Sequence, residues 1–75
     1  MPKLRIEIAA ADQIEAKRVQ SVYQRNERIV KLDEEATDEA GKAGYTPVGR
    51  PVFVGLTNGD PLMYRFDVPV EASGR

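Results

Sequence analysis

The stretch Arg25–Asp33, RNERIVKLD, decides between two folds for the first half of this 75-residue chain. Neither Gly nor Pro interrupts residues 13–40, where Glu, Lys, Arg, Gln and Ala predominate, and these residue types favour helix. The preferred prediction is therefore one long or kinked helix that runs through the stretch. In the alternative, the helix ends near Asn26, a strand covers Arg28–Leu32, and Asp33 caps a short acidic helix.

The apolar side chains of this helical segment support both interpretations. At 100° per residue, a continuous helix collects most of them within an arc of about 80°: Ile14, Val22, Ile29, Leu32, Ala36, Ala40 and Ala43. Arg18 and Arg25 lie in the same arc, however, and Val19, Tyr23 and Val30 form a second apolar strip on another side. The second strip counts against an unbroken helix.

The regions on either side of the helical segment have clearer patterns. Lys3–Ile8, KLRIEI, alternates apolar and charged residues with the period of a half-buried strand. Asp12 and Glu15 have the spacing of a capping box, which starts the helix at about Gln13. Tyr45–Pro51, YTPVGRP, is too rich in Pro and Gly for a regular element, so we expect a loop there.

The last third of the chain has the pattern of a β-hairpin. Two β-rich runs, Val52–Leu56 and Leu62–Val70, flank the turn residues TNGDP. A two-residue Asn-Gly turn would place the apolar face of one run beside the polar face of the other. We therefore predict a three-residue loop, Thr57–Gly59, with Leu56 opposite Asp60, because this loop brings the two apolar faces together.

The predicted register determines which side chains of the hairpin face outward. It pairs Val54 with Leu62 and Val52 with Tyr64, so these side chains face the core. The opposite face then carries Phe53, Met63 and Arg65. The preferred interpretation is that these are ordinary surface residues or that the helix covers this side, and a small patch that a protein partner contacts is the alternative.

Together these elements predict a single α+β domain. It has an N-terminal strand (about 3–9), one long or broken amphipathic helix (about 12–42), a C-terminal β-hairpin (about 51–70) and a frayed tail (71–75), with a small, mainly antiparallel sheet. A helix of about 30 residues would extend about 45 Å, roughly twice the length of such a sheet. The surplus half would carry apolar residues to a partner, so we expect a homodimer or a heteromeric complex: Ile29, Leu32 and Ala36.

The composition of the chain excludes several kinds of chemistry. It has 11 basic and 12 acidic residues, a net charge of −1, and neither Cys nor His. Without Cys and His there is no disulfide, no ordinary zinc site, and no usual general base or activated thiol. We therefore expect no enzymatic activity, no cofactor and no bound metal. Because no apolar run is long enough to span a bilayer, we expect a cytoplasmic protein without membrane association.

Two charged surfaces are further candidates for function. A helical wheel groups a basic stripe of the kind that follows a phosphate backbone: Lys17, Gln24, Arg28 and Lys31. The second surface is a cluster of five carboxylates: Asp33, Glu34, Glu35, Asp38 and Glu39. The preferred interpretation of this cluster is a solvated surface, and docking on a basic protein is the alternative.

The first functional hypothesis is a non-enzymatic protein-interaction module, an accessory or inhibitory protein that acts by occupying a partner's surface. Its candidate contact residues come from the hairpin and from the helical segment: Phe53, Met63, Arg65, Ile29 and Leu32. A nucleic-acid-associated protein that uses the basic stripe is the alternative. A structural subunit of a larger assembly is the third hypothesis.

Overall fold

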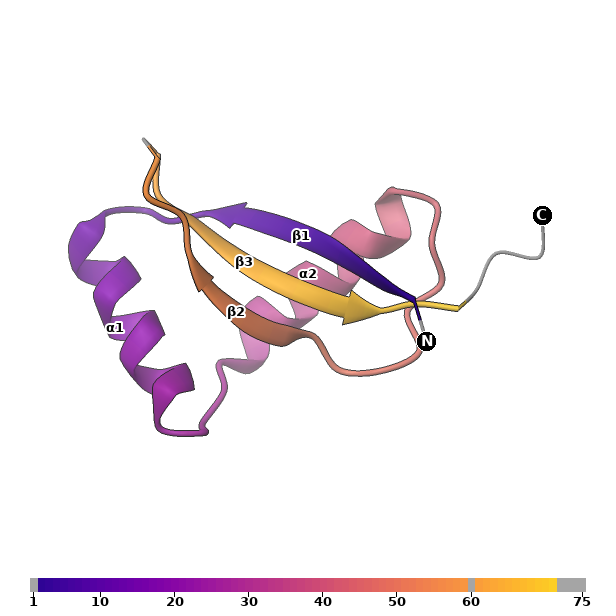
Figure 1. Cartoon of the computed structure of the whole chain (residues 1–75), viewed down its shortest axis with the longest axis horizontal. Helices are drawn as coiled ribbons and strands as arrows, with labels where there is room; N and C mark the ends of the chain where they lie inside the picture. Colours follow the sequence, from indigo (N-terminus) through magenta and orange to yellow (C-terminus); the bar gives the residue numbers. More distant parts are fainter. Residues whose placement is uncertain (1, 60, 72–75) are drawn as a thin grey trace.

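The computed structural model describes residues 2–59 and 61–71, which form a three-stranded antiparallel sheet with two helices against one face (Figure 1). In chain order the elements are β1 (Lys3–Ala9), α1 (Gln13–Gln24), α2 (Val30–Lys42), β2 (Val52–Leu56) and β3 (Met63–Pro69). The α+β prediction is confirmed. The preferred single long helix is wrong, because the chain forms two helices. Over the described ranges, no helix combines the length and apolarity needed to cross a membrane.

The helical segment breaks at Asn26, whose φ of 61° is left-handed. Asn tolerates this conformation better than most residues, because its short polar side chain can bond locally. The alternative prediction placed the end of the first helix correctly but was wrong about a strand at Arg28–Leu32. That stretch continues into α2, which has Ile29 at its N-cap and Asp33 in its first turn. Asp33 therefore does not cap α2, and its carboxylate lies near the positive end of the helix dipole.

The predicted start of α1 agrees with the structure. Asp12 is the N-cap residue, and its Oδ1 accepts a hydrogen bond of 2.8 Å from the backbone N–H of Glu15. A capping box has two hydrogen bonds, and this is the one that the side chain of the cap residue accepts. The Glu15 carboxylate instead accepts from Arg18 Nη2 at 2.9 Å. The helix thus starts where its sequence signal lies.

The order of strands in the sheet is β1-β3-β2, so β3 lies in the middle. β1 pairs with β3 in a regular register that sets Ile6 opposite Phe66. Side chains of both strands alternate between the helix-facing side and the open side, as the pleat requires. The helix-facing side forms the core together with small side chains of the helices: Ile6, Tyr64, Phe66, Val68, Val70, Ala16, Val19, Ala36 and Ala40.

The predicted register of the hairpin is wrong for two reasons: the pairing nearest the turn is already shifted, and β2 contains a bulge between Phe53 and Gly55. Leu56 pairs with Tyr64, whereas beyond the bulge Phe53 pairs with Phe66. The loop is also longer than three residues. The backbone reaches φ 151° at Gly55, a conformation that side chains rarely allow.

The bulge reverses the faces of β2 relative to the prediction. Phe53 points toward the helices, while Val52 and Val54 lie on the open side with 55% and 47% of their surface exposed. The predicted pairs of Val52 with Tyr64 and Val54 with Leu62 therefore do not form. The predicted partner of Leu56, Asp60, lies outside the described residues.

The open side of the sheet carries ion pairs between neighbouring strands. Arg5 Nε of β1 lies 2.6 Å from Asp67 Oδ1 of β3, and Arg65 Nε of β3 lies 3.0 Å from Glu7 Oε2 of β1. Each pair joins residues that are directly opposite in the register. Cross-strand pairs of opposite charge stabilise a sheet modestly.

Candidate functional site

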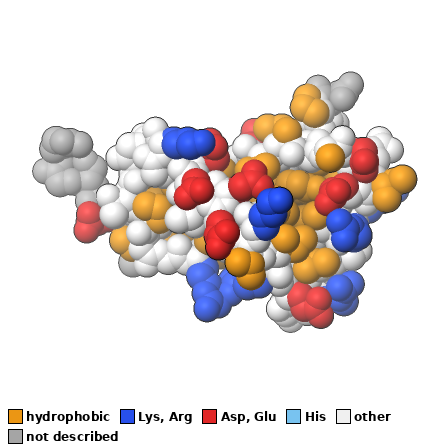
Figure 2. All heavy atoms as spheres, turned by 180° about the vertical axis from the view of Figure 1, so that it is seen from behind, with side chains coloured by type: hydrophobic (Ala, Val, Ile, Leu, Met, Phe, Trp, Pro, Cys, Tyr) orange, Lys and Arg blue, Asp and Glu red, His pale blue; other side chains and the backbone are white. Residues whose placement is uncertain are grey.

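A groove of about 520 Å³ runs between α1 and α2, with the sheet at its base. We call it the interhelical groove, and its larger apolar lining residues are Ile8, Val19, Val22, Ile29, Leu32 and Tyr64. Figure 2 shows hydrophobic side chains gathered between the two helices on this face, with charged side chains around them. The groove exists because the break at Asn26 folds α2 back instead of continuing α1.

The rim of the interhelical groove carries charges of both signs. Glu15 and Arg18 line it from α1, and Lys31 and Glu35 line it from α2. Arg18 and Glu15 are already paired with each other. An apolar base surrounded by a polar rim is the usual anatomy of a protein-protein contact surface.

Tyr64 at the base of the groove has an unusual hydroxyl. The residue is only 3% exposed, and its Oη has no hydrogen-bond partner among residues 2–59 and 61–71. Burial raises the pKa of Tyr64, and the nearby carboxylates of Glu15 and Asp12 raise it further. The hydroxyl therefore stays protonated at neutral pH. An unsatisfied buried hydroxyl costs about 1–3 kcal/mol of stability.

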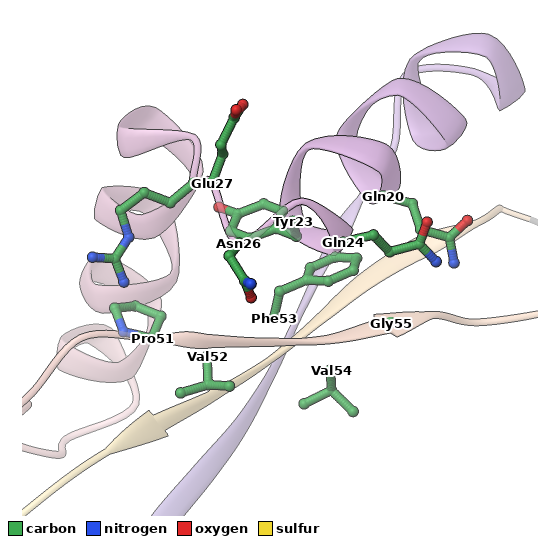
Figure 3. Close-up of a pocket in the computed structure, with 11 residues that line it drawn as sticks. Gln20, Tyr23, Gln24, Asn26, Glu27, Pro51, Val52, Phe53, Val54 and Gly55 are labelled. Atoms are coloured by element: carbon green, nitrogen blue, oxygen red, sulfur yellow. The ribbon is translucent and has the colours of Figure 1, made fainter.

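A second hollow, of about 530 Å³, lies between the end of α1 and β2 (Figure 3). Its base is an aromatic stack in which the ring centroids of Tyr23 and Phe53 are 4.6 Å apart with 11° between the planes. Figure 3 shows Phe53 pointing to Tyr23, and Val52 and Val54 pointing to the other side of β2. Phe66 meets Phe53 edge to face, with centroids 5.5 Å apart. This cluster is the contact that attaches α1 to β2.

The hydroxyl of Tyr23 joins the two helices across their break. It accepts from the backbone N–H of Ile29 at 3.2 Å and lies 2.9 Å from Asp33 Oδ1. The other carboxylate oxygen of Asp33 pairs with Arg28 Nε at 3.1 Å. Burial raises the pKa of Tyr23 to about 12, and the hydrogen bond to Asp33 contributes in the same direction. The network holds the turn between α1 and α2, so we assign it a structural role.

Of the five predicted partner-contact residues, the structure groups Ile29 with Leu32 and Met63 with Arg65, and it sets Phe53 apart from both pairs. Ile29 and Leu32 both line the interhelical groove. Phe53 is packed under α1, where the bulge has turned it. Met63 and Arg65 lie on the open side of the sheet, with Arg65 paired to Glu7. The binding role of these residues stays a prediction.

The predicted basic stripe is divided by the break. Lys17 and Gln24 belong to α1, Lys31 belongs to α2, and Arg28 lies in the connection, where it pairs with Asp33. They therefore do not share one face of a continuous helix. Their contact with phosphates stays a prediction, although the continuous helix face on which it was based does not form.

The acidic residues are distributed over several surfaces. Asp33, Glu34 and Asp38 line a hollow of about 440 Å³, which Arg28 and Arg50 also line. Glu35 belongs to the rim of the interhelical groove, and Glu39 pairs with Lys42 at 3.5 Å. Within the part of the chain that the structure describes, no three carboxylates are arranged to hold a metal ion.

The sequence alone predicts no groove between the two helices. Its patterns place four of the lining residues in the core or in apolar strips and not at a surface: Ile8, Val19, Val22 and Tyr64. The second apolar strip, which includes Val19, was the available signal, because a second apolar side on a helix suits a helix with two neighbours.

No protein-family model, curated protein sequence or solved structure matches this chain.

Proposed function

We propose that this chain is a non-enzymatic protein-interaction module that binds an amphipathic helix of a partner protein in the interhelical groove. The observation that carries the proposal is an apolar groove between the two helices with a charged rim. Such a protein acts as an accessory or inhibitory factor, since it occupies a surface of its partner. The proposed compartment is the cytoplasm, on the sequence grounds given above.

The shape and chemistry of the groove suit a helix better than an extended peptide. Its α1 wall extends from Glu15 to Val22, about 10 Å at 1.5 Å per residue, which accommodates about two helical turns. Helices bind such grooves through apolar residues spaced i, i+3, i+4 and i+7. Polar residues beside that apolar face would meet the charges of Glu15, Arg18, Lys31 and Glu35.

Selection from a library of 14-residue helical peptides displayed on phage tests this proposal. We expect the selected peptides to carry apolar residues at i, i+3, i+4 and i+7 and to bind the purified chain when measured by fluorescence anisotropy. Leu32→Ala and the rim change Glu35→Arg should each weaken that binding at least about tenfold, on the scale of 1.4 kcal/mol per decade.

Val54→Ala is the matched control, because Val54 is an exposed apolar residue on the opposite side of the sheet. It should leave peptide affinity within about twofold. Selected peptides without a helical apolar pattern would contradict the proposal, as would binding that Val54→Ala reduces and Leu32→Ala does not.

The nucleic-acid hypothesis has a separate test. Binding through Lys17, Arg28 and Lys31 would appear as retention on DNA or RNA at about 50 mM salt, weakening steeply as salt increases. We expect no retention, because Arg28 is paired with Asp33 and the other two residues lie on different helices.

A further inference from the structure

The order of strands leaves β1 and β2 as the two edges of the sheet (Figure 1). An edge strand presents unpaired N–H and C=O groups, which proteins often block with bulges, prolines or very short strands. β2 has these features: it is five residues long, contains a bulge, and follows Pro51. β1 has seven residues and pairs with β3 without a register shift. The edge of β1 is therefore the better surface for adding a strand.

The hydrogen bonds at the two ends of β1 show which backbone groups face outward. Ala10 N–H donates to Leu62 O at 2.9 Å, and Val70 N–H donates to Pro2 O at 3.1 Å. Bonded and non-bonded pairs alternate in an antiparallel ladder, so the even-numbered residues of β1 bond to β3. The odd-numbered residues direct their N–H and C=O groups away from β3, and all of them are exposed: Lys3, Arg5, Glu7 and Ala9.

We propose that a second copy of this chain pairs with this edge, β1 against β1, antiparallel about a twofold axis through Ile6. The two sheets then become one continuous sheet. Arg5 of each copy lies opposite Glu7 of the other, and Lys3 lies opposite Ala9. These are the residues whose backbone groups face outward, so the new ladder uses the unpaired donors and acceptors of both strands.

The charges of β1 favour this register over its neighbours. Within each copy Arg5 pairs with Asp67 and Glu7 pairs with Arg65. Across the joined sheet, Asp67 and Arg5 of one copy are followed by Glu7 and Arg65 of the second copy. The charges in this row alternate between negative and positive. A shift of two residues in either direction puts Arg5 opposite Arg5 or Glu7 opposite Glu7. Like charges directly opposite each other destabilise a pair of strands.

The helix-facing side of β1 is also complementary in this register. Leu4 and Ile8 are partly buried in the single chain, and each lies opposite the other in the pair, with Ile6 beside Ile6. The joined strands therefore continue the apolar face of the sheet. This inference goes beyond the helix-binding proposal and does not depend on it, because its variants are on the outer edge of the sheet.

Sedimentation equilibrium on charge-reversed chains tests the pairing. The wild-type chain should reach twice its monomer mass of 8.3 kDa as concentration increases. Arg5→Glu alone places two carboxylates opposite each other, and Glu7→Arg alone places two cations opposite each other. Each variant alone should have a dimer Kd at least tenfold weaker than that of wild type. An equimolar mixture should dimerise again, because every facing pair then has unlike charges.

Lys3→Glu is the matched control, since it makes the same kind of charge change on the same strand but faces Ala9. It should leave the dimer Kd within about twofold. Far-UV circular dichroism should be recorded for each variant to check that it is folded. This check is needed because Arg5 and Glu7 also form ion pairs within the chain, which the substitutions remove.

A second measurement uses the wild-type chain, so its result does not depend on whether the charge variants fold. Amide hydrogen exchange followed by NMR should slow for Lys3, Arg5, Glu7 and Ala9 at high protein concentration and accelerate on dilution. A wild-type chain that stays monomeric at millimolar concentration would overturn the proposal. Dimers that both single variants retain, or exchange of these amides that is independent of concentration, would overturn it too.

Discussion

At the scale of single residues, the two most informative side chains are both tyrosines, of which Tyr23 is partly buried and Tyr64 is buried. The hydroxyl of Tyr23 contacts Ile29 and Asp33, whereas that of Tyr64 has no partner among the described residues. A hydrogen bond contributes about 0.5–1.5 kcal/mol net, but an unpaired buried group carries a penalty. The same chemical group therefore stabilises the fold at one position and costs stability at the other.

Removing each hydroxyl should have opposite effects on the free energy of unfolding. Tyr23→Phe should lower it by about 1–2 kcal/mol, and Tyr64→Phe should leave it unchanged or raise it by up to about 1 kcal/mol. Urea unfolding followed by circular dichroism measures both. A loss for Tyr64→Phe as large as that for Tyr23→Phe would show that the Tyr64 hydroxyl is not a cost to the isolated chain.

At the scale of elements, the bulge in β2 is the feature that attaches the hairpin to α1. By shifting the register between Phe53 and Gly55, it turns the Phe53 ring into contact with Tyr23 and Phe66. Aromatic pairs in such geometries contribute about 0.5–1.5 kcal/mol beyond the area that they bury. This gain accounts for a register in which Val52 and Val54 are left on the open side.

Replacing Gly55 tests how far the bulge depends on a backbone that only glycine adopts readily. At φ 151° a Cβ would strain the backbone, although nothing lies within 4 Å of where it would be. Gly55→Ala should lower the free energy of unfolding by about 1–3 kcal/mol.

Gly41→Ala is its control: Gly41 is in α2 with open space around it. This change should raise the free energy of unfolding by about 0.5–1 kcal/mol, the difference in helix propensity between the two residues. If Gly55→Ala were equally stabilising, the bulge would not need its glycine.

At the scale of the whole molecule, alkaline pH should weaken the fold through its tyrosines. Burial raises the pKa of Tyr23 from 10.0 to about 12, so the folded chain holds this proton more tightly than the unfolded chain does. The corresponding stability is complete below pH 10 and is lost as pH rises through about 12.

We therefore expect the free energy of unfolding to fall between pH 10 and pH 12, by about 1–2 kcal/mol from Tyr23, because this side chain is only partly buried and solvent screens part of the effect. Urea unfolding at a series of pH values measures the decline. Tyr23→Phe should decline less steeply over the same interval, and an equal slope would assign the effect to other groups.

Local sequence signals were sufficient for the features that depend on neighbouring residues. The alternation in Lys3–Ala9 determined a strand with one buried face, and Asp12 determined where α1 starts. The apolar pattern of residues 62–70 determined the inward face of β3. Each signal acts within a few residues, through the pleat of a strand or the unpaired amides at a helix end.

The break between the helices, the bulge and the groove were decided by tertiary structure. The turn at Asn26 is held by Tyr23, Ile29 and Asp33, and the register of β2 by the packing of Phe53 against Tyr23. Helix propensity alone favours no break, and apolar patterning alone favours Val52 and Val54 inside. Both local preferences are weak compared with the burial of aromatic rings against distant elements, so contacts between those elements determined the outcome.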